Sequence, residues 1–243
     1  MEGERRTRLR LLTYNVHDLG DDPDAVAHVL RSCDPDVVCL QEVPRRLSAP
    51  WRVARLARET GLHWAAGGRG SGGTAVFTSR RLDLLAAAVG RLPVPWLRRT
   101  RGYALAQVRL AGSAPVTVVS VHLSLVPQQR VAHVALVLRR LADLPRPWLV
   151  AGDLNEAPGG PSWAAFGPAL SDAAARLEAG AGAPTYPAKA PHVRIDAVLV
   201  SPEVVVERLA VAGASEHLSG VDLRSASDHL PVLADLRVPD VIT

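Results

Sequence analysis

The sequence of 243 residues predicts an α/β fold in which mixed β-sheets are covered by helices. Two observations carry this prediction. Short apolar runs rich in valine, leucine and alanine recur along the chain, and helical patterns separate some of these runs but not others. The hydrophobic fraction of 48% is typical of a globular protein, so the composition excludes a disordered or fibrous chain.

Eight apolar runs are interpreted as buried strands, because polar residues or glycine and proline bound them. In chain order they span residues 9–16, 37–41, 74–78, 103–110, 116–123, 148–152, 193–200 and 231–238.

Two helices are predicted in the first quarter of the chain. Asp22 followed by Pro23 indicates an N-cap with proline at the first helical position, for a helix that runs to about Cys33. The second helix is expected from near Ser48 to Gly61, since glycine commonly ends a helix.

A third helix, over residues 127–144, has the clearest pattern. Its apolar residues recur at three- and four-residue spacing and form one stripe, which is typical of a helix that packs on a sheet. They are Val131, Val134, Ala135, Leu138 and Leu141.

We expect a single domain. No repeat of fixed period and no low-complexity tract is present, and the segments 67–73 and 179–191 are predicted to be loops within the domain. The domain is therefore expected over residues 9–238, between an N-terminal tail at 1–8 and a C-terminal tail at 239–243.

The sequence also predicts the location of the protein and the state of its cysteines. Nothing in the sequence approaches an apolar membrane span of about 20 residues. The N-terminal residues are charged and lack the apolar run of a signal peptide, so we expect a cytoplasmic protein. Two cysteines, Cys33 and Cys39, are too few for a disulfide framework or a four-thiolate zinc site and are expected to be buried.

The charge gives weak evidence for an anionic substrate. The formal net charge is +4 at pH 7, and Lys189 is the only lysine, so nearly all basic residues are arginine, the better bidentate partner for phosphate. A GC-rich genome would produce the same excess of arginine. No segment concentrates five or more like charges as a polybasic arm would.

Polar residues able to do chemistry lie at the ends of these apolar runs. Buried groups of this kind are costly unless they bind an ion or take part in a reaction. Each alone has an ordinary explanation, such as a turn-forming asparagine or a structural histidine. Together they predict one functional site, formed by Asn15, Gln41, Glu42, His122, Asp153, Asn155, Asp196, Asp228 and His229.

The motifs that contain these residues resemble those of the endonuclease/exonuclease/phosphatase superfamily, in the family order and over residues 9–237. They are Thr13-Tyr14-Asn15, Leu40-Gln41-Glu42-Val43, Val121-His122-Leu123, Gly152-Asp153-Leu154-Asn155, Arg194-Ile195-Asp196 and Ser227-Asp228-His229-Leu230-Pro231. The resemblance implies a four-layer α/β sandwich, with two mixed β-sheets packed face to face, helices outside and the site at one end.

The resemblance also implies a metal-dependent hydrolase of phosphoester bonds, in which an activated water attacks in line. Glu42 would be the principal metal ligand, with Asn15 beside it and Asp228 near the ion. Hard oxygen donors of this kind suit Mg²⁺, with Mn²⁺ or Ca²⁺ as alternatives, better than zinc.

Five residues match catalytic positions of the superfamily. Asp153 matches the aspartate that orients or deprotonates the attacking water, and Asn155 the amide that binds the phosphoryl oxygen. His229 would act as acid, base or cationic stabiliser, with Asp196 fixing its tautomer. His122 matches a histidine that contacts the phosphate or protonates the leaving group, and the sequence does not decide between the two histidines.

Contacts to the substrate are less defined by the sequence. Arg98, Arg99 and Arg101 precede the strand at 103–110 and could meet a substrate phosphate or form a solvated loop; Arg101 is the candidate substrate-binding residue. The tryptophans are scattered and are expected to pack in the core or at its rim: Trp51, Trp64, Trp96, Trp148 and Trp163.

Three functions remain open. The first is a bacterial phosphodiesterase or nuclease with a small or single-stranded substrate, because a chain this compact leaves no room for long inserted arms that grip a duplex. The second is a sphingomyelinase-like enzyme or an inositol-phosphate phosphatase, and the third a non-catalytic binding module. The complete residue set favours catalysis. The expected partner is a phosphoester substrate, with nucleic acid or a nucleotide as candidates, and no obligate protein partner is expected.

Overall fold

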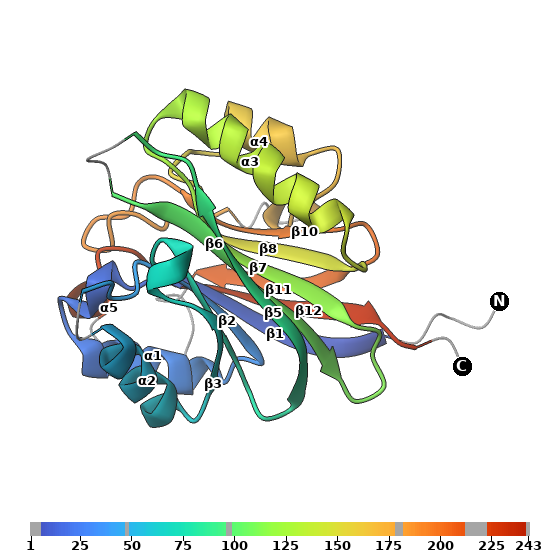
Figure 1. The fold of residues 1–243 in the computed structure, drawn as a ribbon, viewed down its shortest axis with the longest axis horizontal. Helices are drawn as coiled ribbons and strands as arrows, with labels where there is room; N and C mark the ends of the chain where they lie inside the picture. Colours follow the sequence, from blue (N-terminus) through green and yellow to red (C-terminus); the bar gives the residue numbers. More distant parts are fainter. Residues whose placement is uncertain (1–5, 47–48, 96–98, 178–181, 212–222, 242–243) are drawn as a thin grey trace.

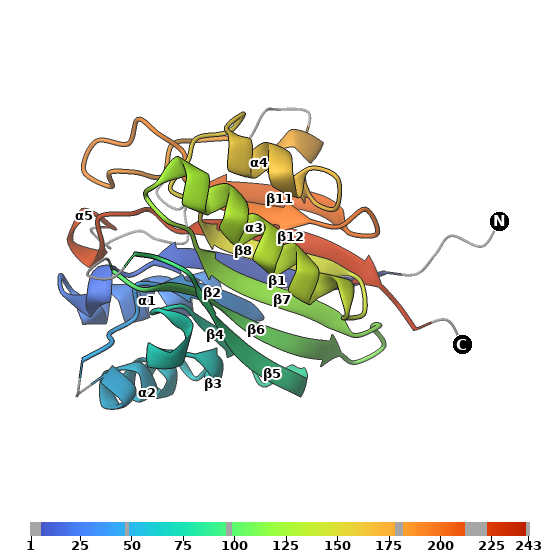
Figure 2. The same cartoon turned by 45° about the horizontal axis from the view of Figure 1, so that its top comes forward.

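The computed structural model describes residues 6–46, 49–95, 99–177, 182–211 and 223–241. Over these ranges, strands form two mixed six-stranded sheets that pack face to face. Helices cover the outer face of each sheet (Figures 1 and 2). The predicted four-layer α/β sandwich is therefore confirmed.

The first sheet has the strand order β11-β12-β1-β2-β4-β3. Its central pair, β1 and β2, is parallel, and the other pairs are antiparallel. A parallel pair needs a crossover connection, which helix α1 provides here. The bounds are β1 Arg6–Asn15, β2 Val37–Gln41, β3 His63–Gly67, β4 Ala75–Thr78, β11 Val205–Val211 and β12 Val232–Pro239.

The second sheet has the order β5-β6-β7-β8-β10-β9. Its one parallel pair is β7 and β8, joined through helix α3. The bounds are β5 Leu82–Leu92, β6 Arg101–Leu110, β7 Val116–His122, β8 Trp148–Asp153, β9 Ser171–Asp172 and β10 Asp196–Val200. Each sheet thus places one parallel pair near its centre, and this arrangement aligns the carboxyl ends of the paired strands.

Helices form the two outer layers. The first sheet is covered by α1 (Pro23–Cys33), α2 (Ala49–Thr60) and α5 (Leu223–Ala226). The second is covered by α3 (Pro127–Ala142) and α4 (Pro161–Phe166). Asp22 caps α1 as predicted, because its carboxylate accepts from the backbone N–H groups of Asp24 and Ala25 at 3.0 Å. Short 3₁₀ turns lie at η1 His17–Leu19, η2 Arg69–Ser71 and η3 Ala174–Arg176.

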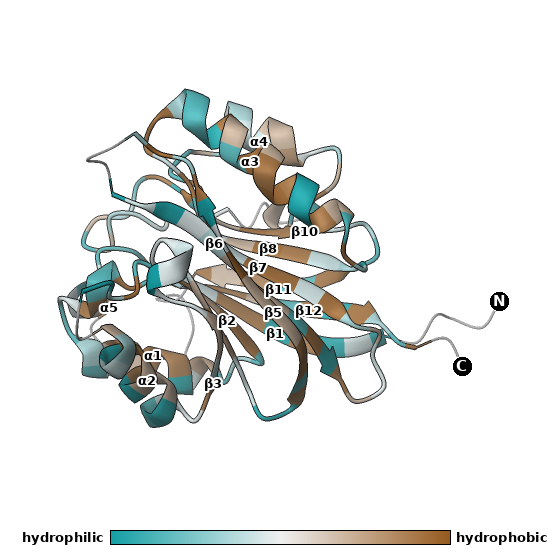
Figure 3. Ribbon diagram, in the orientation of Figure 1, coloured by the Kyte–Doolittle hydropathy of each residue, from teal (hydrophilic) through white to brown (hydrophobic). Residues whose placement is uncertain are grey.

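Three hydrophobic clusters correspond to the three interfaces between the four layers. Alternate residues of a strand point to opposite faces of its sheet. Leu11 of β1 therefore packs between the sheets, whereas Leu12 packs against the helices. The central strands are accordingly mostly hydrophobic in Figure 3. Cys33 and Cys39 are buried free thiols, as expected.

The predicted elements differ from the observed ones mainly at their ends. β1 starts at Arg6 because residues 6–8 pair with residues 237–239 of β12. β10 starts at Asp196, since Val193 instead forms an isolated bridge with Tyr186. The segment 67–73, expected to be a loop, contains the turn η2.

Parts of several predictions lie outside the described residues: residues 1–5 and 242–243 of the predicted tails, the start of the second helix at Ser48, residues 179–181 of the second predicted loop, Trp96 and Arg98. The described helices include none that is long and apolar enough to cross a bilayer.

Candidate active site

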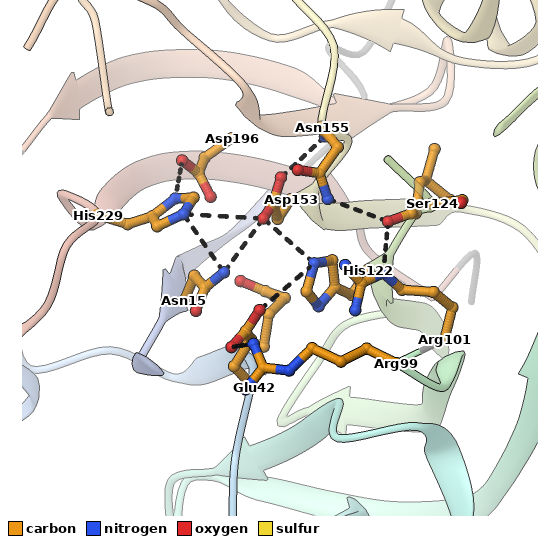
Figure 4. Close-up of polar contacts among 12 residues, drawn as sticks. Asn15, Glu42, Arg99, Arg101, His122, Ser124, Asp153, Asn155, Asp196 and His229 are labelled. Carbon is orange, nitrogen blue, oxygen red and sulfur yellow. Dashed lines mark hydrogen bonds and ion pairs between the residues drawn. The ribbon is translucent and has the colours of Figure 1, made fainter. Parts of the chain in front are cut away.

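Six of the predicted site residues come together at one end of the sandwich, three from each sheet (Figure 4). The first sheet contributes residues at the ends of β1 and β2 and before β12, and the second those at the ends of β7 and β8 and the start of β10: Asn15, Glu42, His229, His122, Asp153 and Asp196. Asp153 pairs with both His122 and Asp196 in the strand register, so the backbone ladder itself sets these three side by side.

The Asp153 carboxylate lies at the centre of the site. Its Oδ2 accepts a hydrogen bond from Nδ2 of Asn15 at 3.1 Å and lies 3.4 Å from Nε2 of His122. The same oxygen is 3.8 Å from Nε2 of His229. Its Oδ1 accepts from the backbone N–H of Asn155 at 2.8 Å. Asp153 therefore connects the two sheets and both histidines.

The environment of Asp153 also changes its proton affinity. Burial raises the pKa of its carboxyl to about 7, although the charge of His229 and the hydrogen bonds from Asn155 and Asn15 act in the opposite direction. A carboxylate with a pKa near neutrality is suited to accept a proton during a reaction.

The glycine before Asp153 is required by the close approach of β7. Gly152 has a φ of +152°, and a Cβ at this position would lie 2.0 Å from the carbonyl oxygen of Val121. The Gly-Asp pair of the motif thus has a steric cause, because only glycine lets β8 place Asp153 next to the end of β7.

His229 and Asp196 form a buried pair. Nδ1 of His229 lies 2.9 Å from Oδ2 of Asp196, and the ring of Tyr186 packs on the imidazole at 4.8 Å between centroids. Burial opposes the charged imidazolium, but Asp196, Asp153 and Asp228 outweigh it and raise the pKa of His229 to about 10. At neutral pH His229 is therefore a cation.

His122 is electrostatically the opposite of His229. It is fully buried, and burial together with the positive charge of Arg101 holds the pKa of its imidazole well below the usual value. Its Nε2 lies between Oδ2 of Asp153, at 3.4 Å, and Oε1 of Glu42, at 3.9 Å. A neutral imidazole at this place can donate a hydrogen bond without carrying charge.

Glu42 is held by an arginine. Nη1 of Arg99 donates to Oε2 of Glu42 at 2.7 Å, and Nη2 donates to Oδ2 of Asp18 at 2.5 Å. Glu42 and Asn155 both have a φ of +51°, a left-handed conformation that is uncommon for residues other than glycine. Such positions cost on the order of 1–3 kcal/mol each and cluster at functional sites.

The donor set fits a hard divalent cation. Asn15 and Glu42 offer amide and carboxylate oxygens in the site, and Oδ1 of Asn15 also accepts from the backbone N–H of His17 at 3.1 Å. The part of Asp228 as a further ligand stays a prediction. Oδ1 of Asp228 and Oδ1 of Asp196 are buried and have no hydrogen-bond donor among the described residues. Buried anionic oxygens without donors are groups that a cation would satisfy.

Arg101, the candidate substrate-binding residue, lies below the surface of the site. Its Nε donates to the carbonyl oxygen of Leu123 at 2.8 Å, and Nδ2 of Asn155 donates to the same oxygen at 3.0 Å. Its Nη1 is buried without a partner in the described ranges. Arg101 therefore supports the corner that carries Asn155, and its contact with substrate stays a prediction. Arg98 lies outside the described residues.

Several supporting residues were not predicted from the sequence. Oγ1 of Thr185 accepts from the backbone N–H groups of Ile195 and Asp196, at 3.2 and 3.3 Å. Arg99 was expected to meet a substrate phosphate or to lie in a solvated loop, whereas it binds Glu42. These contacts depend on loops between the motifs, and no spacing signal in the sequence marks them.

Gln41 has a structural role that its motif did not reveal. Its Nε2 donates to Oγ of Ser120 at 3.1 Å and to Oγ1 of Thr13 at 3.1 Å. The Ser120 hydroxyl in turn donates to the carbonyl oxygen of Leu40 at 2.9 Å. This buried polar bridge joins β2 of the first sheet to β7 of the second, directly behind the site.

Solved structures share this architecture. An endonuclease/exonuclease/phosphatase from Bacteroides vulgatus superposes with a TM-score of 0.79 at 20% identity, over 96% of this chain and 99% of the other. A mannosyl-6-phosphatase of Bacteroides thetaiotaomicron gives 0.74 at 19% identity, over 94% and 99%. TDP2 of D. rerio, complexed with a single-strand DNA product, gives 0.73 at 21% identity, over 95% and 99%. At these identities the likeness shows the fold alone.

Sequence comparison assigns the family. The search of curated proteins found no significant match. The sequence profile of the Endonuclease/Exonuclease/phosphatase family matches residues 12–229, which include every predicted site residue. The chain therefore belongs to the endonuclease/exonuclease/phosphatase family and is a phosphoester hydrolase.

Proposed function

We propose that the protein is a divalent-metal-dependent phosphodiesterase that acts on nucleotides or single-stranded nucleic acid. The observation that carries this proposal is the position of Asp153, a buried carboxylate between an amide, a neutral imidazole and a cationic imidazole. A single cytoplasmic catalytic domain is part of the same proposal.

Asn15, Glu42 and Asp228 would hold the ion, for which Mg²⁺ is the first candidate and Mn²⁺ or Ca²⁺ the alternatives. When bound, the ion neutralises negative charge on the phosphoryl oxygens. The Arg99 guanidinium on Glu42 is compatible with this assignment, because it leaves Oε1 of that carboxylate without a close hydrogen bond.

Asp153 would orient the attacking water and take its proton. The water oxygen forms a bond to phosphorus as the bond to the leaving oxygen breaks, in line with the attack. The pKa of Asp153, raised by burial, lets the carboxylate accept this proton near neutral pH.

The two histidines would divide the remaining work by charge. His229, which Asp196 keeps protonated, is placed to stabilise the negative charge that develops on the phosphoryl group. His122, which is neutral, is placed to hydrogen-bond an oxygen of the substrate beside Glu42. Asn155 would use the free N–H of its amide for a phosphoryl oxygen.

A substrate panel tests this function. Bis-p-nitrophenyl phosphate, p-nitrophenyl phosphate, single-stranded oligonucleotides, plasmid DNA, sphingomyelin and inositol phosphates are each incubated with Mg²⁺, Mn²⁺, Ca²⁺ or EDTA. We expect metal-dependent cleavage of the diester and of single strands. The fold similarity to a mannosyl-6-phosphatase makes a monoester the second candidate, and faster cleavage of p-nitrophenyl phosphate would favour it.

The residue assignment is tested on the same substrates. Glu42→Gln and Asp153→Asn should abolish cleavage while the chain stays folded, as judged by circular dichroism. Unchanged hydrolysis in both variants, or full activity in EDTA, would show that the metal-dependent mechanism is wrong.

A further inference from the structure

A cavity rich in arginine lies beside the candidate active site. It has a volume of about 390 Å³, which is within the range of small-molecule sites. Its lining includes four arginines and one acidic residue, and all of them belong to the described part of the chain: Asp18, Gly20, Pro44, Arg45, Arg46, Arg52 and Arg99.

Arg99 connects this arginine cavity to the catalytic groups. Its guanidinium binds Oε2 of Glu42 at 2.7 Å with one nitrogen and Oδ2 of Asp18 at 2.5 Å with another. A ligand in the cavity would therefore sit next to the carboxylate that we assign to the metal. The cavity is placed to receive a part of the substrate that extends beyond the phosphate being cleaved.

Two of the other arginines, Arg45 and Arg52, are held in place mainly by backbone carbonyl groups. Nη1 of Arg45 donates to the carbonyl oxygen of Thr100 at 3.3 Å and to its hydroxyl at 3.2 Å. Nη2 of Arg52 donates to the carbonyl oxygen of Leu19 at 2.5 Å. These contacts fix the guanidinium groups without neutralising their charge, because a carbonyl carries no net charge.

Asp18 is the one carboxylate in the lining. It lies 2.5 Å from Arg99 and 3.9 Å from Nε of Arg45, so it bridges two of the four guanidinium groups. The Arg46 side chain is exposed and has no hydrogen-bond or ionic partner among the described residues. The cavity thus keeps an excess of positive charge. The one anionic group in its lining is the Asp18 carboxylate, which a phosphate group can replace.

We propose that the arginine cavity binds a second phosphate group of the substrate, whose oxygens replace the Asp18 carboxylate on Arg99 and Arg45. Guanidinium groups form paired, charge-assisted hydrogen bonds to phosphate oxygens, and one phosphate group can contact both guanidinium groups at once. The role of this phosphate in catalysis rests on the proposed function, whereas its binding to the cavity does not.

An exposed tryptophan indicates the source of this phosphate. A neighbouring hollow is lined in part by Trp51 and shares Arg52 with the arginine cavity. Trp51 is 65% exposed, so of the two predicted places, the core and its rim, it does not occupy the core. A phosphate beside a flat apolar surface matches a nucleotide unit, because nucleobases stack on aromatic side chains. We therefore assign the second phosphate to a nucleic-acid strand.

Binding is measured without catalysis, in EDTA and at low salt, by isothermal titration calorimetry. The probes are inorganic pyrophosphate, a short single-stranded phosphorothioate oligonucleotide and inositol hexakisphosphate. We expect Arg46→Ala to weaken pyrophosphate binding by about three- to tenfold, as the loss of one charged contact predicts. Asp18→Asn should tighten it by a similar factor of about three to ten, because the competing charge is removed.

Two features keep this test specific. Asparagine tolerates the left-handed backbone that Asp18 adopts at a φ of +55°, so Asp18→Asn should fold. Arg81→Ala is the matched control, since Arg81 is an exposed arginine paired with Asp36 away from the cavity, and it should bind every probe as the wild type does.

The variants also identify the source of the phosphate. Trp51→Ala should weaken oligonucleotide binding and leave pyrophosphate binding unchanged. If Trp51→Ala changes the binding of neither probe, and inositol hexakisphosphate binds more tightly than the oligonucleotide, the assignment to a nucleic-acid strand is wrong.

If Arg46→Ala and Asp18→Asn both bind pyrophosphate as the wild type does, the cavity proposal is overturned. These outcomes do not depend on hydrolysis, so an inactive protein that still binds would contradict only the proposed function.

Discussion

The two sheets treat buried aspartates in opposite ways. Away from the site, Asp235 on β12 is bound by Arg10 at 2.8 Å and by Arg8 at 3.2 Å. Burial alone would raise the pKa of Asp235, but these arginines outweigh it and lower the pKa. At the site, no arginine contacts Asp153 in the described ranges, and burial raises the pKa of that carboxyl.

The difference separates a structural carboxylate from a reactive one. Asp235 has its charge matched by permanent cations, so it stays ionised and stabilises the fold. Asp153 has only amides and imidazoles as partners. Its carboxylate can therefore interact with a bound ion or accept a proton. Both side chains are about 2% exposed, so solvent contact does not distinguish them, whereas their charged partners do.

The largest expected effect is at the reactive carboxylate. Asp153→Asn should lower the rate of metal-dependent diester hydrolysis by about 10²–10⁴-fold, because a general base is lost. The free energy of unfolding should stay within about 1 kcal/mol of the wild type or rise, since a buried charge is removed. Rates with bis-p-nitrophenyl phosphate and urea unfolding measure the two quantities. A rate within a factor of about ten would contradict the general-base role.

Substitution of Asp235, the structural carboxylate, should lower stability and leave activity unchanged. Asp235→Asn should lower the free energy of unfolding by about 2 kcal/mol, because charge-assisted hydrogen bonds to Arg8 and Arg10 are weakened. Hydrolysis per folded molecule should not change. Urea denaturation at pH 7 measures the first effect. A stable variant with reduced activity would show that the comparison between Asp235 and Asp153 fails.

The effect at Asp235 should also depend on pH. Its folded pKa lies below its unfolded pKa, so its contribution to stability is present above the unfolded value of about 3.9 and is lost as the pH falls through the folded value. The stability difference between wild type and Asp235→Asn should therefore shrink toward zero in acid. Urea unfolding from pH 7 to pH 3 tests this. Asp83→Asn, in an exposed pair with Arg109, is the control and should show little difference at any pH.

The smallest effect is expected at a supporting residue. Thr185→Val removes the oxygen that accepts from the backbone of Ile195 and Asp196, so the Asp196–His229 pair should be less well placed. We expect kcat to fall by about three- to tenfold with KM nearly unchanged. Thr185→Ser keeps the hydroxyl and should restore the rate. If both variants lose the same fraction of kcat, Thr185 acts through packing and not by positioning Asp196.

The strands that the sequence predicted share one property. All eight are interior strands of the two sheets, and the four that it missed, β3, β5, β9 and β11, are the four sheet edges. An interior strand of this sandwich is buried on both faces and reads as a continuous apolar run. β5 and β11 have many exposed residues, and β9 has only two residues, so no such run marks them.

The site was predictable for a related reason. Its six central residues follow or begin interior strands, so the same runs that predict the strands also locate the side chains. The contacts of Arg99 and Thr185 were not predictable, because each comes from a loop whose path is set by the folded sheets. The role of Gln41 was hidden for the same reason, since its partner Ser120 lies on the other sheet.

The polar bridge from Gln41 to Ser120 has a consequence for how activity develops during folding. Neither sheet alone contains a working set of groups, since Asp153 and its Asn15 partner belong to different sheets. A refolding chain can therefore regain secondary structure before it regains turnover. Hydrolysis becomes possible only once the sheets have docked and this bridge has closed. The delay between recovery of the circular dichroism signal and recovery of activity therefore measures how long the docking step takes.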